Sequence, residues 1–208
     1  MNRQIIATGT AAALLSCSLW CCHAANTPDT ILGELNQMRS NPAAYAAKVA
    51  GRRQYYKSRA LQLPGQIPIQ TTEGVAALDE AVRVLRATKP LPPVAASRAL
   101  NRAAADHVRD IGPKGLVSHE GTNHSSPSAR VSRYATDFSM IAEVISFGPD
   151  DPASVVIDLL VDDGVPTRGH RKILLEPDLR VVGVACGKHT VYRTMCVMDL
   201  ADRVVEKH

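Results

Sequence analysis

The sequence has 208 residues, which is the usual length of one domain and short for two. Apolar residues make up 45% of the chain and charged residues 21%, both ordinary fractions for a globular protein. The formal net charge is only +4 and the basic residues are dispersed, which argues against a nucleic-acid-binding surface. Aromatic residues are 4% of the chain, so the core must consist mainly of aliphatic side chains.

The first 24 residues resemble a signal peptide. Arg3 is the only charged residue before position 29, an apolar run covers residues 5–20, and the small residue Ala24 precedes the expected cleavage site. We therefore expect a mature single domain over 25–208 that is secreted or periplasmic and has no stable membrane span.

Two other interpretations of this N-terminal segment stay open. One is an uncleaved anchor, although the apolar run is about four residues short of a membrane span. The other is a lipoprotein, because residues 14–17 resemble a lipobox with Cys17 as the lipidated residue. All three interpretations place the domain outside the cytoplasm.

Apolar residues recur at helical spacing in the first half of the chain, and proline or glycine separates the segments. The predicted helices cover residues 29–40, 43–56, 71–88 and 97–111. The second half is predicted to contain a short helix at 128–135, a strand at 139–147, a helix at 152–163, a helical turn at 167–174 and strands at 179–187 and 191–200. Helices first and strands last indicate an α+β fold with an antiparallel sheet.

The last two predicted strands form a hairpin, and each carries one cysteine. We expect Cys186 and Cys196 to form a disulfide, because cross-strand neighbours come within bonding distance and an exported domain is oxidised. The alternative is a pair of free buried thiols.

Four segments of the second half carry polar side chains suited to a binding or catalytic site: 118–121 (SHEG), 142–146 (AEVIS), 159–164 (LLVDDG) and 168–172 (RGHRK). The last continues as Gly-His-Arg-x-x-x-Leu-x-Pro into Val-Gly-Val, and the first predicted helix contains Leu-Asn-x-x-Arg at 35–39. These features resemble the CAP superfamily (SCP domain) of cysteine-rich secretory, antigen 5 and pathogenesis-related proteins, which has many exported bacterial members. The resemblance covers about residues 31–201.

The resemblance implies an α-β-α sandwich with a small antiparallel sheet between helical layers. It also implies a cleft with two histidines and two acidic residues, which correspond here to His119, Glu143, Asp162 and His170. Asp163 is the alternative to Asp162, and we favour Asp162 from the alignment of the preceding leucine pair. The family's Gly-Glu-Asn-Ile is Ala-Glu-Val-Ile here, and the second acid is an aspartate, one methylene shorter than glutamate.

Two imidazoles with carboxylates are suitable ligands for a divalent metal ion, and zinc is the expected one. We expect weak binding through His119 and His170, because the shorter aspartate reaches an ion less easily than glutamate. The favoured function is a non-enzymatic module that binds an extracellular or envelope ligand, such as a lipid or sterol. The alternative is a metal-dependent, peptidase-like hydrolase using the same cleft. We expect a monomer and no nucleic-acid partner.

Other polar residues of the second half are interpreted as structural. His107 is expected to be a hydrogen-bonded core histidine, and His124 a solvated loop residue. A basic cluster surrounds His170 at Arg168, Arg171, Lys172 and Arg180. We expect these side chains to form a solvated rim that pairs with Glu176 and Asp178; the alternative is a site for an anionic headgroup or carboxylate.

Overall fold

The computed structural model describes residues 28–207, so the expected signal peptide (1–24) and Cys17 lie outside the described residues. The helices are α1 (Pro28–Ser40), α2 (Pro42–Ala50), the 3-10 helix η1 (Gly51–Tyr55), α3 (Val75–Ala87), α4 (Arg98–Ile111), α5 (Pro127–Val131), α6 (Pro152–Val161) and α7 (Gly169–Leu174). The strands are β1 (Tyr56–Lys57), β2 (Ala60–Leu61), β3 (Ile69–Gln70), β4 (Ala95–Ala96), β5 (Ala135–Thr136), β6 (Ile141–Phe147), β7 (Val181–His189), β8 (Arg193–Ala201) and β9 (Val205–Glu206). None of these helices is both long and apolar enough to cross a membrane.

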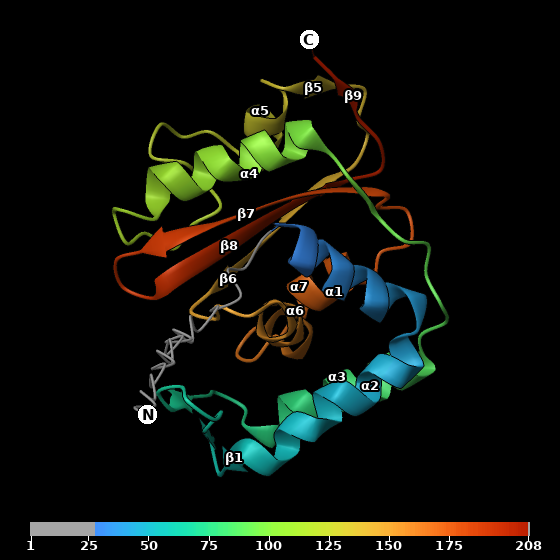
Figure 1. The fold of residues 1–208 in the computed structure, drawn as a ribbon, viewed down its shortest axis with the longest axis vertical. Helices are drawn as coiled ribbons and strands as arrows, with labels where there is room; N and C mark the ends of the chain where they lie inside the picture. Colours follow the sequence, from blue (N-terminus) through green and yellow to red (C-terminus); the bar gives the residue numbers. More distant parts are fainter. Residues whose placement is uncertain (1–27, 208) are drawn as a thin grey trace, which may run out of the picture.

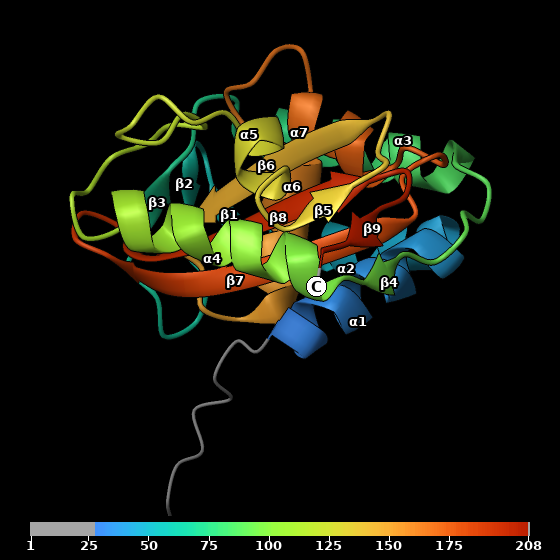
Figure 2. The same cartoon turned by 90° about the horizontal axis from the view of Figure 1, so that it is seen from above.

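The elements form an α-β-α sandwich, as the sequence predicts. Figure 1 shows α4 and α5 on one face of the central sheet, and α1, α6 and α7 on the other. Helices α2 and α3 lie side by side beyond α1 and α6 (Figure 1). Seen from above, α4 lies along β7 and β8, whereas α5, α6 and α7 lie near β6 (Figure 2).

Several helices begin where a polar cap precedes a proline. The side chains of Asn41, Ser126 and Asp151 each accept a hydrogen bond from the backbone N–H three residues later, and each is followed by proline. This satisfies one of the free N–H groups at the helix start, and proline at the first helical position needs no N–H partner. Local sequence therefore sets the starts of α2, α5 and α6.

The central sheet has the strand order β4-β7-β8-β6. Strand β8 pairs antiparallel with both β7 and β6, and the short β4 adds in parallel to β7. Cys186 faces Cys196 across β7 and β8 with a Cα–Cα distance of 4.1 Å, and the two form a disulfide. The predicted disulfide is confirmed, and it holds these two strands in register.

The two faces of the sheet carry two different apolar layers. Val144 belongs to the larger core cluster, with side chains of α1, α3 and α6. Ile145 belongs to a second cluster with Ala104 and Val108 of α4. Because side chains alternate along a strand, neighbouring residues of β6 serve opposite layers.

Helix α4 lies unusually close to β7 at a glycine. A Cβ atom on Gly183 would lie 2.0 Å from the carbonyl carbon of Leu100 and 2.1 Å from the backbone nitrogen of Asn101. The side-chain oxygen of Asn101 accepts a hydrogen bond from the N–H of Val184 at 2.7 Å. The Gly in the Val-Gly-Val segment is therefore required by close helix–strand packing.

The short strands were not anticipated. Residues between the second and third helices were expected to form a loop, but β1, β2 and β3 form a small antiparallel sheet there. The helix expected at 128–135 is shorter, because Ala135 already belongs to β5, which pairs with β9. Strands of two residues are too short to show a period in the sequence.

Arg39 joins three parts of the chain from inside the core. Its side chain is fully buried, and its guanidinium donates to the carbonyl oxygens of Pro92, Leu174, Glu176 and Leu179 at 2.9 to 3.2 Å. Buried carbonyl groups are costly when unpaired, so Arg39 stabilises the connector before α4 and the segment between α7 and β7.

We expect Arg39→Met to lower the free energy of unfolding by about 3 kcal/mol or more, because several buried carbonyls lose their donor. Arg86→Met is the matched control, since Arg86 is exposed on α3, and it should change stability by less than about 0.5 kcal/mol. Urea unfolding followed by circular dichroism measures both. Equal stability of the two variants would contradict the role given to Arg39.

Candidate functional site

His119 and Glu143 form the first histidine–carboxylate pair. His119 lies in the loop between α4 and α5, and its Nδ1 is 2.8 Å from Oε1 of Glu143 in β6. The His119 side chain is 53% exposed, whereas that of Glu143 is only 1% exposed. Because a carboxylate can only accept, Nδ1 carries the proton and Nε2 of the neutral ring is left with its lone pair.

The buried Arg130 binds Glu143 of this pair, and it was not identified from the sequence. Its NH2 is 2.5 Å from Oε2 of Glu143, and the side chain is 2% exposed. The same guanidinium donates to the carbonyl oxygens of His119 (3.1 Å) and Ser125 (2.7 Å). Arg130 therefore fixes both the charge of Glu143 and the loop that carries His119.

Asp199 lies directly opposite Glu143 in the pairing of β8 with β6, and it is fully buried. Burial raises the pKa of Asp199 well above its ordinary value, and the negative charge of Glu143 adds to this. Burial opposes ionisation of Glu143 too, but the hydrogen bond from His119 and the charge of Arg130 hold its pKa below the usual range. The pair is therefore one ionised Glu143 beside one protonated Asp199.

The buried polar groups without a partner gather at this point. Among the described residues, the buried side-chain N and O atoms that lack a hydrogen bond are Nδ1 of His107, Nε of Arg130 and both carboxyl oxygens of Asp199. His107 is fully buried, as predicted, and its Nε2 bonds the carbonyl oxygen of Ser118 at 2.8 Å and lies 3.9 Å from Glu143. Such a concentration of unpaired atoms is unusual for a purely structural cluster.

His170 and Asp162 form the second pair. Asp162 closes α6 in the left-handed conformation, with φ of 56°. Its Oδ1 is 2.6 Å from Nδ1 of His170, and its Oδ2 accepts from the N–H of His170 (3.0 Å) and of Arg171 (3.4 Å). Asp162 therefore orients the imidazole and also caps the first turn of α7.

Asp163 has a different partner. Its carboxylate accepts from the backbone N–H groups of Thr72 (2.6 Å) and Glu73 (2.8 Å), just before α3. Asp162 is thus the aspartate in contact with His170, and Asp163 joins the end of α6 to the segment before α3.

The expectation of a solvated arginine rim is wrong for Arg168 and Arg171. Arg168 binds the carboxylates of Glu73 and Glu80 at 2.6 to 3.0 Å. Arg171 is buried, donates to Glu80 at 2.7 Å and also binds backbone carbonyls at the end of α6. These side chains turn inward and connect the start of α7 to Glu80 of α3 and to Glu73 just before α3.

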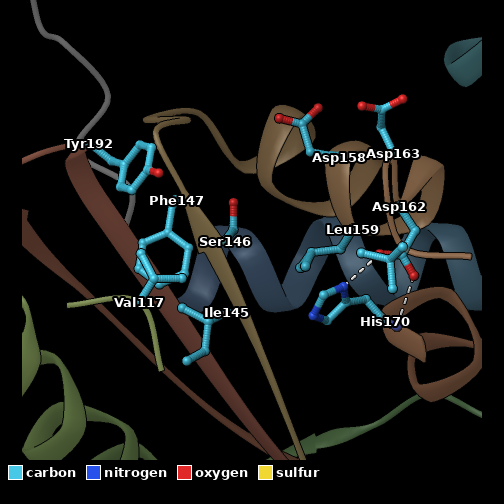
Figure 3. A pocket seen from close by; sticks show the side chains of 11 residues that line it. Val117, Ile145, Ser146, Phe147, Asp158, Leu159, Asp162, Asp163, His170 and Tyr192 are labelled. Atoms are coloured by element: carbon cyan, nitrogen blue, oxygen red, sulfur yellow. Dashed lines mark hydrogen bonds and ion pairs between the residues drawn. The ribbon is translucent and has the colours of Figure 1, made fainter. Parts of the chain in front are cut away.

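A pocket of about 280 Å³ lies beside the second pair. Ile145 and Ser146 of β6 lie between its two walls, as Figure 3 shows. The lining on one side is apolar, from Val117, Phe147 and Tyr192. The lining on the other side is partly acidic, from Asp158, Leu159, Asp162, Asp163, Val165 and His170.

The structure thus joins the four predicted residues in two pairs. His170 and Asp162 line the pocket, whereas His119 and Glu143 do not, although Val117 and Ile145 stand two residues from them. Convergence of all four on one cleft stays a prediction.

Within residues 28–207 no group of three or more His, Cys, Asp or Glu side chains is placed to hold one metal ion. Each histidine has its Nδ1 bound to a carboxylate, which is the usual support for a metal-ligating Nε2, but two imidazoles fall short of the four ligands of a structural zinc centre.

A family model and two solved structures match parts of the chain. The family model for the CAP, or cysteine-rich secretory protein, family matches residues 80–200. An extracellular SCP-domain protein from Bacillus anthracis is 22% identical with a TM-score of 0.45, and the match covers 54% of this chain and 35% of that one. An outer surface protein from Borrelia burgdorferi is 20% identical with a TM-score of 0.47, and the match covers 54% of this chain and 80% of that one. No curated protein sequence matches the chain.

The protonated state of Asp199 predicts a pH dependence of stability. Between the unfolded pKa of about 3.9 and the raised native pKa, only the unfolded state releases the proton, so wild-type stability falls as pH rises. Asp199→Asn does not titrate, so its stability relative to wild type should increase as pH rises above about 4, until the pH passes the raised native pKa of Asp199. Urea unfolding at four pH values measures this.

Asp202→Asn is the matched control. Hydrogen bonds from Ser139 hold the pKa of Asp202 below its usual value, so above about pH 4 its carboxylate is ionised in both the native and the unfolded state, and its contribution to stability does not change with pH. The stability of this variant relative to wild type should therefore stay constant where that of Asp199→Asn rises. Parallel stability curves for wild type and Asp199→Asn would show that Asp199 is ionised in the native protein.

Proposed function

The chain belongs to the CAP (cysteine-rich secretory protein) family, and we propose that it is an exported, extracytoplasmic module whose ligand enters the pocket beside β6. The signal-peptide pattern of residues 1–24 supports export. The disulfide between Cys186 and Cys196 suits an oxidising compartment.

The observation that carries the proposal is the lining of the pocket. Apolar side chains dominate one wall, and a few convergent polar groups stand on the other, which is the usual composition of a ligand site. Val117 and Tyr192 of the apolar wall are exposed, so a ligand that covers them removes apolar surface from water. At about 280 Å³ the pocket is at the lower end of small-ligand sites, so it suits one part of a larger ligand.

The side chains of the pocket favour binding over catalysis. Ser146 supplies a hydroxyl, but no hydrogen bond joins it to His170 among the described residues, and the Nδ1 of that histidine is bound to Asp162. A serine nucleophile normally has its base within hydrogen-bond distance. The metal-dependent hydrolase stays the alternative, and no contact of the described residues specifically favours it.

A large side chain at the pocket should exclude the ligand. We expect native mass spectrometry of the exported protein, purified without denaturation, to find a bound ligand on wild type and a strongly reduced load on Val117→Trp. Val191→Trp is the matched control, because Val191 is equally apolar and exposed but does not line the pocket. Equal ligand loads on the two variants would contradict the assignment of the pocket.

Zinc binding through His119 and His170 is retained as a separate proposal. Each ring has a free Nε2, but two imidazoles form an incomplete ligand set, so we expect binding far weaker than the roughly 10 kcal/mol or more of structural zinc sites. Calorimetric titration of zinc should give heats with wild type that His170→Ala loses. His124→Ala, at a fully solvated loop histidine, should keep them. Loss of the heats in both variants, or in neither, would contradict this proposal.

A further inference from the structure

Strand β6 forms one edge of the central sheet, and its hydrogen-bond pattern can be assigned from its two ends. The N–H of Gly148 donates to the carbonyl of Thr194, and the N–H of Asp202 donates to the carbonyl of Met140. Both bonds fall on the same register as the β6–β8 pairing. Since hydrogen-bonded and non-hydrogen-bonded pairs alternate, the even-numbered residues of β6 bind β8 and the odd-numbered residues direct N–H and C=O outward.

The outward-facing residues include Glu143, Ile145 and Phe147. Within residues 28–207 their outward backbone groups make no hydrogen bond to another segment. Ile145 and Phe147 line the pocket. Glu143 is 6% exposed as a residue but 1% exposed as a side chain, so its accessible surface is mostly backbone. Two residues of the pocket lining, Ile145 and Phe147, therefore have outward backbone groups that no other described segment pairs.

Unpaired backbone groups in a partly buried pocket are costly, and an extended peptide is the ligand that satisfies them in series. We propose that the pocket binds an extended segment of another protein, which adds as a strand to the free edge of β6. This rests on the proposed function, because it names the ligand class of the same pocket.

The two walls also specify the side chains of that segment. Residues of an added strand alternate between the two faces of the sheet. On one face they meet the apolar Val117 and Phe147, and on the other they meet Asp158 and Asp163. Asp158 is 33% exposed beside its partner Arg52, and Asp163 binds only backbone N–H groups, whereas the side chain of Asp162 is buried against His170. No lysine or arginine lines the pocket among the described residues. The complementary segment therefore alternates apolar and basic residues.

The probe for this proposal is a fluorescein-labelled peptide amide, Val-Lys-Val-Lys-Val, titrated by fluorescence polarisation at low salt. We expect saturable binding to wild type, and at least about tenfold weaker binding of Val-Glu-Val-Glu-Val, since its carboxylates meet the acidic wall. Two further versions carry N-methyl groups on alternate backbone amides. One of them should lose binding about tenfold or more and the other should bind normally, because only alternate amides face β6.

A matched pair of variants tests the edge of β6 itself. Phe147→Ala and Phe147→Pro both remove the ring, but only proline removes the outward N–H, and it leaves the bonds to β8 intact. We expect Phe147→Pro to bind the lysine peptide at least about tenfold more weakly than Phe147→Ala. Circular dichroism melts show whether both variants fold. If one of them does not, the two methylated peptides still test the alternation of outward backbone groups on the wild-type protein.

Three results would overturn the proposal. They are no binding of the lysine peptide at 1 mM, equal binding of both methylated peptides, and equal binding by the two Phe147 variants. A fourth result would also overturn it: sedimentation could show a wild-type dimer and a monomeric Phe147→Pro variant. The edge of β6 would then be assigned to a second copy of this chain. If native mass spectrometry then finds a non-peptide ligand that Val117→Trp excludes, the proposed function stands and strand addition is rejected.

Discussion

Glu143 stands opposite Asp199 because β6 pairs with β8 over the full length of the strand, from Ile141 facing Ala201 to Phe147 facing Met195. This pairing decides which side chains face α4 and which backbone groups face the pocket. A slip of one residue would exchange the two faces of β6, bringing Glu143 into the aliphatic layer around α6 and exposing Val144 to Arg130. An unpaired carboxylate in that layer is costly, and so is an arginine left without its partner.

The same pairing places the acids that hold the two histidines on different faces of the sheet. Glu143, on the α4 face, holds His119, whereas Asp162 lies at the end of α6 on the other face and holds His170. The edge of β6 borders the pocket, where the outward backbone groups of Ile145 and Phe147 have no partner within residues 28–207. Glu143 also binds the buried Arg130 and lies opposite Asp199, so its register sets the whole buried charge cluster as well as the orientation of His119.

Much of the fold could be predicted from the sequence. The helices α1, α3, α4 and α6 follow from apolar spacing bounded by caps and prolines, and β6, β7 and β8 follow from their apolar runs. The disulfide follows from the hairpin.

Arg130 and Asp199 could not be found in this way, because only the strand register brings them to Glu143. The choice between Asp162 and Asp163 likewise depends on a left-handed backbone conformation at the end of α6. The pocket was missed because its apolar wall combines Val117, Phe147 and Tyr192, which lie in separate parts of the sequence.

Amide hydrogen exchange along β6, resolved residue by residue in the free protein, tests the register most directly. The amides of Val144 and Ser146, which bind β8, should exchange slowly, close to the rate of global unfolding. The amides of Ile145 and Phe147 point away from β8 and should exchange markedly faster. Slow exchange at Ile145 and Phe147 with fast exchange at Val144 and Ser146 would show the opposite alternation, and would contradict both the placement of Glu143 and the free edge at the pocket.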